Sequence, residues 1–261
     1  MSTTQETFIS HLVELRDRLL RAIVAIVVVF VCLMPWAGSI YDLLAQPMLR
    51  ALPDGTRMIA TGVVTPFFVP VKVTLMVAFV LALPVVLYQA WAFVAPGLYA
   101  HEKRLALPLV VGGTVLFILG MSFCYFFVFG TVFKFIAEFA PKSITPAPDI
   151  EQYLSFVMTM FLAFGLTFEV PIVVILLVKF GVVSVAKLKE ARPYVIVGAF
   201  IVAAVVTPPD VVSQFMLAVP MCLLFELGLL LAGLVTTRAP SIEAEGVMAA
   251  SSGAEPPPPS R

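Results

Sequence analysis

Four glutamates stand out in this sequence because of where they fall among long apolar stretches. Glu169 and Glu226 each lie inside an apolar run, where an ionised carboxylate must face a cavity, a partner or the bundle interior. Glu14 and Glu102 lie beside such runs, close to arginines and lysines. Carboxylates inside a membrane could relay protons, whereas carboxylates at its surface could each hold a guanidinium through two hydrogen bonds.

Each of these carboxylates also has a purely structural interpretation. Glu169 could be satisfied by a neighbouring helix, and Glu226 could pair with the fifth apolar segment or with a second subunit. Glu14 could form an exposed i,i+4 pair with Arg18, and Glu102 could favour the start of the next helix. The functional interpretation is favoured for Glu169. Spacing alone favours the structural one for Glu14 and Glu102.

The composition decides the class of protein that carries these residues. The chain has 261 residues, is 61% apolar and 12% charged, and has a mean hydropathy of +1.06 with no net charge. So few charged residues could not cover the surface of a soluble fold of this size. The chain also has no excess of basic residues that could bind the phosphates of a nucleic acid. The three cysteines are far apart, and no metal-ligand spacing or phosphate-binding loop is present. We therefore expect an all-α membrane protein with no metal, no cofactor and no enzymatic site.

Six apolar segments are candidates for membrane crossings. They are Leu19–Trp36, Pro66–Val94, Leu105–Phe133, Tyr153–Val178, Pro193–Thr207 and Phe215–Val235. The fifth segment is short, because its 15 residues make a helix of about 22 Å against about 30 Å of hydrocarbon. The fold predicted from this pattern is a polytopic bundle of six transmembrane helices.

Charge and polarity predict the orientation of the chain and its two ends. Eleven arginines and lysines fall on the side of the two termini and four on the other, which predicts that both termini are cytoplasmic. Lys72, near the outer end of the second segment, can snorkel to the surface. The first twenty residues predict an amphipathic surface helix running into the first segment. We expect a membrane domain over residues 1–236 and a disordered tail over 237–261.

Two further classes of function are considered from these residues. A proton-coupled small-molecule transporter could use Glu169 and Glu226 as a relay. An intramembrane serine hydrolase would need a serine beside a histidine or lysine base within the bundle. Both histidines, His11 and His101, lie outside the apolar segments, which argues against the hydrolase.

Short motifs follow one another along the chain in an order that resembles one family over its whole membrane domain. They are HLVELR (11–16), MIAT (58–61), PFF (66–68), YQAWAFVAPGL (88–98), HEKR (101–104), YLSF (153–156), FG (164–165), FEVP (168–171), RPY (192–194), TPPD (207–210) and SQ (213–214). Up to about residue 236 the sequence resembles the C subunit of the twin-arginine protein translocase, the TatC family, and its proteobacterial members in particular.

The resemblance implies a fold and a function. It implies a cupped six-helix bundle with short fifth and sixth helices in the bacterial cytoplasmic (inner) membrane. Its role would be to receive signal peptides in a system that exports folded proteins using the proton-motive force. The implied partners are the single-helix TatA- and TatB-type subunits, twin-arginine signal peptides, other copies of the chain and membrane lipid.

The resemblance also implies roles for individual residues. Carboxylates matching Glu14 and Glu102 bind the paired arginines of the signal peptide. The surrounding recognition region comprises Phe93, Lys103, Arg104 and Arg16. Glu169 matches a polar residue of the concave membrane face, and Pro47 matches a sensitive position in the first outer loop. Partner subunits would dock around Thr207, Asp210 and Gln214.

Two departures from the family pattern qualify these assignments. Members often have an acidic residue before the Pro-Phe pair, whereas residues 61–65 here contain none. Lys103 stands where relatives frequently have arginine, and it keeps the charge while losing the planar fork.

Overall fold

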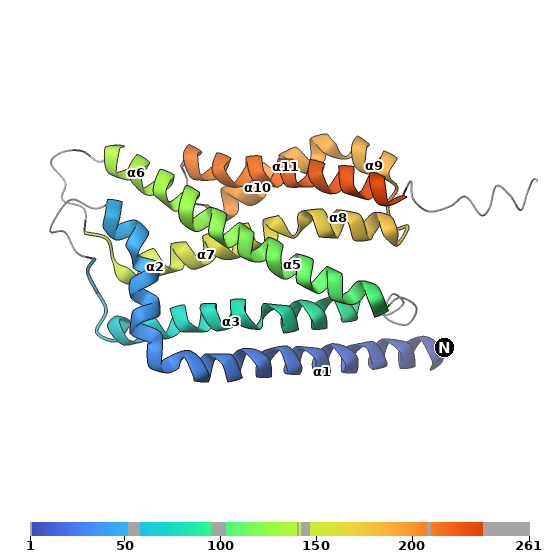
Figure 1. Ribbon diagram of the computed structural model, residues 1–261, viewed down its shortest axis with the longest axis horizontal. Coiled ribbons are helices and arrows are strands. Elements are labelled where there is room, and N and C mark those ends of the chain that lie inside the picture. Colours follow the sequence, from blue (N-terminus) through green and yellow to red (C-terminus); the bar gives the residue numbers. More distant parts are fainter. Residues whose placement is uncertain are drawn as a thin grey trace, which may run out of the picture.

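The computed structural model describes residues 2–51, 58–94, 103–139, 141, 147–207 and 210–236, with the backbone alone at 2–10, 51, 94, 103–106, 235 and 236. These residues are almost entirely helical (Figure 1). The helices are α1 (Ser2–Leu33), α2 (Ala37–Ala51), α3 (Thr65–Val94), α5 (Lys103–Phe123), α6 (Phe129–Phe139), α7 (Ile150–Phe168), α8 (Val170–Lys179), α9 (Val185–Glu190), α10 (Arg192–Val206) and α11 (Val211–Thr236). A 3-10 turn, η1 (Met34–Trp36), joins α1 to α2, and a π-helical segment, η2 (Cys124–Val128), joins α5 to α6. The predicted tail over 237–261 lies outside the described residues.

The apolar helices confirm the predicted polytopic membrane fold. Within the described residues, five helical stretches are long and apolar enough to cross a bilayer, and α10 is a shorter apolar helix. The fifth crossing is short as predicted, with 15 residues in α10. The sixth, α11, has 26 residues, so the expectation of a short sixth helix is wrong. The helix begins at Val211, one turn before the predicted start at Phe215. In this first turn the Asp210 carboxylate accepts a hydrogen bond from the Ser213 amide at 2.6 Å.

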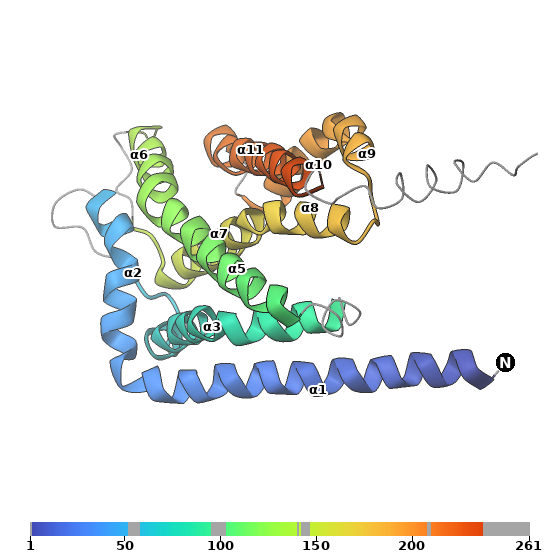
Figure 2. The same ribbon diagram turned by 45° about the vertical axis from the view of Figure 1, so that its right-hand side comes forward.

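The first helix runs without a break from the amino-terminal end into the membrane. Figures 1 and 2 both show α1 as one rod, so the helix predicted over the first twenty residues does run into the first crossing. Its 32 residues span about 48 Å, more than the roughly 30 Å of a hydrocarbon core. Both described ends of the chain lie at one end of the bundle (Figure 1). We name it the inner end, since the charge count predicts that it is cytoplasmic, and name the opposite one the outer end.

Two apolar clusters hold the helices together. The larger one joins side chains of α2, α3, α6, α7, α10 and α11, and includes the fully buried Phe129, Met160 and Phe164. The smaller one joins α8, α9 and α11 through residues such as Leu188 and Phe225. The sequence did not predict α9, a helix of six residues that buries only Leu188.

Polar contacts between two distant segments close the outer end. The Ile59 amide donates to the Pro148 carbonyl at 3.0 Å, and the Ile150 amide donates to the Ile59 carbonyl at 2.9 Å. Asp149 then accepts hydrogen bonds from the Thr61 amide at 3.0 Å and from its hydroxyl at 2.7 Å. We call the side chains of this region the outer clamp; they are Thr61, Thr65, Lys72, Asp149 and Glu151.

The outer clamp also ties the start of α3 to the start of α7. Lys72 forms an ion pair with Glu151 at 2.9 Å, and the Thr65 hydroxyl donates to the same carboxylate at 3.3 Å. Lys72 was expected only to snorkel, but it has a definite partner 79 positions away. Asp149 also caps α7, since its carboxylate accepts from the amides of Glu151 and Gln152. Residues 61–65 contain no acidic residue, and the acidic partner of Thr61 is Asp149, immediately before α7.

The outer clamp predicts a dependence of stability on pH. Hydrogen bonds, above all from the Thr61 hydroxyl, hold the pKa of Asp149 below its ordinary value of 3.8. Its carboxylate therefore stabilises the fold fully above that value and loses this contribution as the pH falls below it. In detergent, Asp149→Asn should lower the unfolding temperature at neutral pH and flatten its decline below pH 4. Asp42→Asn, an exposed carboxylate of α2, is the matched control, and identical profiles for the two variants would contradict the assignment.

Candidate functional site

The inner end brings an aromatic stack close to a carboxylate. The His11 ring of α1 stacks on the Phe93 ring of α3, with centroids 4.4 Å apart and planes 17° from parallel. Glu14 follows His11 by three positions, so the two side chains share a face of α1. A helical rise of 1.5 Å places Glu14 about 28 Å from Leu33, which is close to one hydrocarbon thickness. Glu14 therefore lies at the inner boundary of the membrane, near Phe93.

The Glu14 carboxylate is bound within its own helix. Its Oε1 accepts from Arg18 Nε at 2.9 Å and from Arg18 Nη2 at 2.5 Å. The two side chains are 37% and 22% exposed, so this is a surface pair of small net stability. The i,i+4 pair of Glu14 with Arg18, which the spacing predicted, is therefore present in the structure. Arg16, also expected in this region, is exposed and binds the neighbouring Asp17 at 2.8 Å.

The remaining residues expected in the recognition region lie at the edge of the described chain. Lys103 and Arg104 open α5, which begins at the inner end (Figure 1), but their side chains are outside the description. Glu102 precedes them and lies outside the described residues altogether. The structure thus brings His11, one helical turn from Glu14, against Phe93, and the approach of Glu102 to Glu14 stays a prediction.

Glu169 is the one intramembrane carboxylate buried among the described residues. It is 6% exposed, and neither of its side-chain oxygens has a hydrogen-bond partner among the residues that the structure describes. It stands at the break between α7 and α8, where Pro171 follows in the first turn of α8. A Cβ added to Gly113 of α5 would lie 3.0 and 3.1 Å from its two oxygens. The glycine therefore makes the room that the carboxylate occupies.

Glu226 has a different environment. Its carboxylate accepts a hydrogen bond from Arg192, the first residue of α10, at 2.7 Å, and both side chains are nearly half exposed. Of the alternatives left open by the sequence, pairing with the fifth helix is the one realised. Because Glu226 faces an arginine, the structure gives no support to a relay that joins it to Glu169.

A small polar group surrounds the junction of α10 and α11. The Thr207 hydroxyl is buried and donates to the Ala203 carbonyl at 2.8 Å, while Gln214 Nε2 donates to the Phe200 carbonyl at 3.3 Å. Asp210 caps α11 with one oxygen. Its other oxygen and the buried Ser213 hydroxyl have no hydrogen-bond partner within the described residues. The three residues expected to dock partners are therefore neighbours.

Pro47, expected in an outer loop, instead lies inside α2. The helix is anchored to the bundle because the hydroxyls of Tyr125 and Tyr153 donate to carbonyls of Leu43 and Leu44 at 2.9 and 2.8 Å. Pro47 is thus part of a packed helix at the outer end.

The fold and these sites define a polytopic helical membrane protein in which one intramembrane carboxylate, Glu169, is buried among the described residues. Residues 10–220 match the family model described as Sec-independent protein translocase protein (TatC). The chain is 52% identical over 223 residues to the Sec-independent protein translocase protein TatC of Escherichia coli K12, covering 85% of this chain and 86% of that protein. The protein of that name from Haemophilus influenzae is 51% identical, with coverage of 89% and 91%.

A solved structure agrees with the sequence comparisons. The crystal structure titled Twin Arginine Translocase Receptor TatC superposes with a TM-score of 0.76 at 39% identity, covering 87% of this chain and 99% of that one. The chain belongs to the TatC family of protein translocase components. It is a multi-pass membrane protein whose role is in protein transport rather than catalysis, and it works as part of a translocase with protein partners.

Sequence reasoning missed several contacts of these sites. The stacking of His11 on Phe93 and the approach of Gly113 to Glu169 join separate helices, so no local pattern contained them. The Asp149 cap could have been found, because an Asp followed three positions later by Gln152 before an apolar run indicates a helix start.

The two adjacent glycines of α5 provide a matched test of the Glu169 environment. Gly113→Ala should destabilise the protein by about 1–3 kcal/mol, because its Cβ would press on Glu169 and Leu87. Gly112→Ala should be neutral or stabilising, since its Cβ would meet only Ile172 at an ordinary 3.8 Å. Thermal unfolding in detergent measures both effects.

Adding Glu169→Ala to Gly113→Ala should restore part of the lost stability, because it removes the atoms that the new methyl group displaces. Equal effects of the two glycine substitutions would show that the carboxylate does not fill this space.

Proposed function

We propose that the chain is the receptor for twin-arginine signal peptides in the cytoplasmic membrane, with Glu14 and Glu102 as the carboxylates that bind the two arginines. The observation that carries this proposal is the state of Glu14. It is a partly exposed carboxylate at the inner boundary, already bound to an arginine guanidinium and placed near the stacked rings of His11 and Phe93.

An arginine of the peptide can replace Arg18 at Glu14 with little change in chemistry. The guanidinium that arrives makes the same kind of charged hydrogen bonds as the one that leaves, so the carboxylate is never left bare. Lysine lacks the planar fork and would recover only part of these bonds. Because a ligand must displace Arg18 from the Glu14 carboxylate, a peptide arginine would compete for this carboxylate more effectively than a lysine.

The second carboxylate and its neighbours complete the proposed site. Glu102 would hold the other arginine, Lys103, Arg104 and Arg16 would lie around the pair, and Phe93 would form an apolar wall of the site. The apolar segment of the peptide would then extend into the membrane towards Glu169, whose unpartnered oxygens support a role for this break in the α7–α8 crossing. The proton-motive force would drive transport.

We further propose that single-helix partners of the TatA and TatB types dock at the junction of α10 and α11. One Asp210 oxygen and the Ser213 hydroxyl have no partner within the described part of the chain, which supports this role, because unsatisfied polar atoms in hydrocarbon favour a hydrogen-bonding partner. The short α10 leaves this polar group within the membrane rather than beyond it.

Substitution of the two carboxylates tests the receptor role. Each charged hydrogen bond contributes about 1.5–3 kcal/mol, so Glu14→Ala or Glu102→Ala should weaken binding of a twin-arginine peptide roughly 10- to 100-fold. The double variant should export no folded reporter while still accumulating in the membrane. Glu190→Ala, an exposed carboxylate of α9, is the control and should export normally. Normal export by the double variant would refute the assignment.

Two conservative substitutions test the docking site. Thr207→Val and Gln214→Leu remove polar atoms with little change of volume, so they should reduce co-purification of the single-helix partners severalfold. Thr159→Val removes a comparable intrahelical bond on α7, made to Ser155 at 2.8 Å, and should leave co-purification unchanged. The unfolding temperature separates a docking defect from a folding defect. Full partner recovery with both docking variants would contradict the proposal.

A further inference from the structure

A groove runs along α6 towards the outer end of the bundle. Its volume is about 480 Å³. It is lined by Phe126, Phe127, Gly130, Thr131, Lys134, Phe135, Glu138 and Val212, the last from the start of α11. Phe126 and Phe127 lie deeper along the helix, whereas Lys134, Phe135 and Glu138 lie nearer its outer end. The groove is therefore amphipathic along the membrane normal.

The two charges of this groove have a definite order. Lys134 is the first charged residue after 29 uncharged ones, which places it at the boundary of the hydrocarbon. Glu138 lies one turn, or about 6 Å, further out. Both side chains are exposed, and neither forms an ion pair with any residue that the structure describes. A ligand that fits must present a negative group first and a positive group beyond it.

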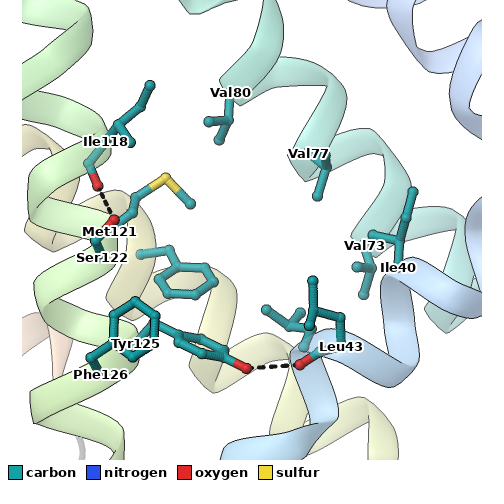
Figure 3. Close-up of a pocket in the computed structure, with 12 residues that line it drawn as sticks. Ile40, Leu43, Val73, Val77, Val80, Ile118, Met121, Ser122, Tyr125 and Phe126 are labelled. Atoms are coloured by element: carbon teal, nitrogen blue, oxygen red, sulfur yellow. Dashed lines mark hydrogen bonds between the residues drawn. The ribbon is translucent and has the colours of Figure 1, made fainter.

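A second, apolar cavity of about 370 Å³ adjoins this groove at Phe126, which lines both (Figure 3). It lies between α2, α3, α5 and α7. Its two polar groups are already used, since the Ser122 hydroxyl donates to the Ile118 carbonyl at 2.7 Å and the Tyr125 hydroxyl donates to the Leu43 carbonyl at 2.9 Å. Only hydrocarbon suits it. A helix, 10–12 Å across with its side chains, is too wide for a space of this volume.

The π-helical segment explains why Phe126 separates the two spaces. A π-turn inserts an extra residue into a helix and shifts the side chains that follow around the axis. Phe126 lies within η2 and is 72% exposed, so its ring stands out from the helix surface between the groove and the cavity.

We propose that these two spaces form a binding site for one phospholipid whose headgroup carries an amine, as in phosphatidylethanolamine. The phosphate binds Lys134, the ammonium group binds Glu138, and one acyl chain passes Phe126 into the apolar cavity. The order of groups along such a lipid, hydrocarbon then phosphate then amine, is the order of the complementary residues along α6. Phosphatidylglycerol has the same phosphate but an uncharged glycerol beyond it, so it would leave Glu138 without a cation to bind.

Exchanging the two charges tests the order directly. The purified chain, in detergent with equal phosphatidylethanolamine and phosphatidylglycerol, should retain the amine lipid several times more strongly by native mass spectrometry. The double variant Lys134→Glu, Glu138→Lys keeps the composition and the net charge but reverses the order, so it should lose this preference. An unchanged preference in the exchanged variant, or equal retention of both lipids by the original chain, would overturn the proposal.

Filling the groove provides a second test that leaves the charges in place. A Cβ added at Gly130 meets no atom within 4 Å, so Gly130→Phe should occupy the groove without disturbing the packing. It should remove one retained amine lipid per chain. Gly198→Phe on α10, where the space is also open, is the control and should retain it. Equal retention in the two variants, or crosslinking of a protein helix instead of lipid to this groove, would contradict the site.

Discussion

The hydrocarbon of a bilayer offers no hydrogen-bond partner, and this constraint governs where the structure is regular and where it is not. Several threonine hydroxyls within the crossings donate to a carbonyl of their own helix, as Thr74 does to Pro70 and Thr114 to Val110, both at 2.8 Å. Glu169 departs from this rule, with two buried oxygens that no described residue satisfies. A group kept at such a cost marks the place in the membrane where a function is most to be expected.

The same constraint explains why the crossings could be predicted and α2 could not. Membrane thickness requires long apolar runs, so the segment predicted at Pro66–Val94 differs from α3 by one residue. The amphipathic α2, with Pro47 within it, gives no such signal. It is held by tyrosine hydroxyls that come from 82 and 109 positions away, and such contacts form only once the bundle has assembled.

At the candidate sites, the sequence likewise predicted which residues are important but not which residues they contact. The sequence was sufficient to single out Glu14, Phe93 and Glu169, because charges and aromatic residues at a membrane boundary or within it are rare enough to notice. It could not supply their neighbours, since His11 and Phe93 are distant in sequence. The outer clamp is an example. The absence of an acidic residue at 61–65 could not indicate that Asp149, 88 positions away, binds Thr61.

The tilt of the third crossing connects the inner and outer ends of the molecule. Its 29 uncharged residues would span about 43 Å, well beyond a hydrocarbon core of about 30 Å, so the helix must lie obliquely. Figures 1 and 2 show α5 and α6 crossing the bundle on a diagonal. The tilt separates α5 from α3 towards the outer end, where α2 and mostly apolar side chains surround the cavity at Phe126. A lipid chain seated there would fill the space that this oblique path leaves between α2, α3 and α5.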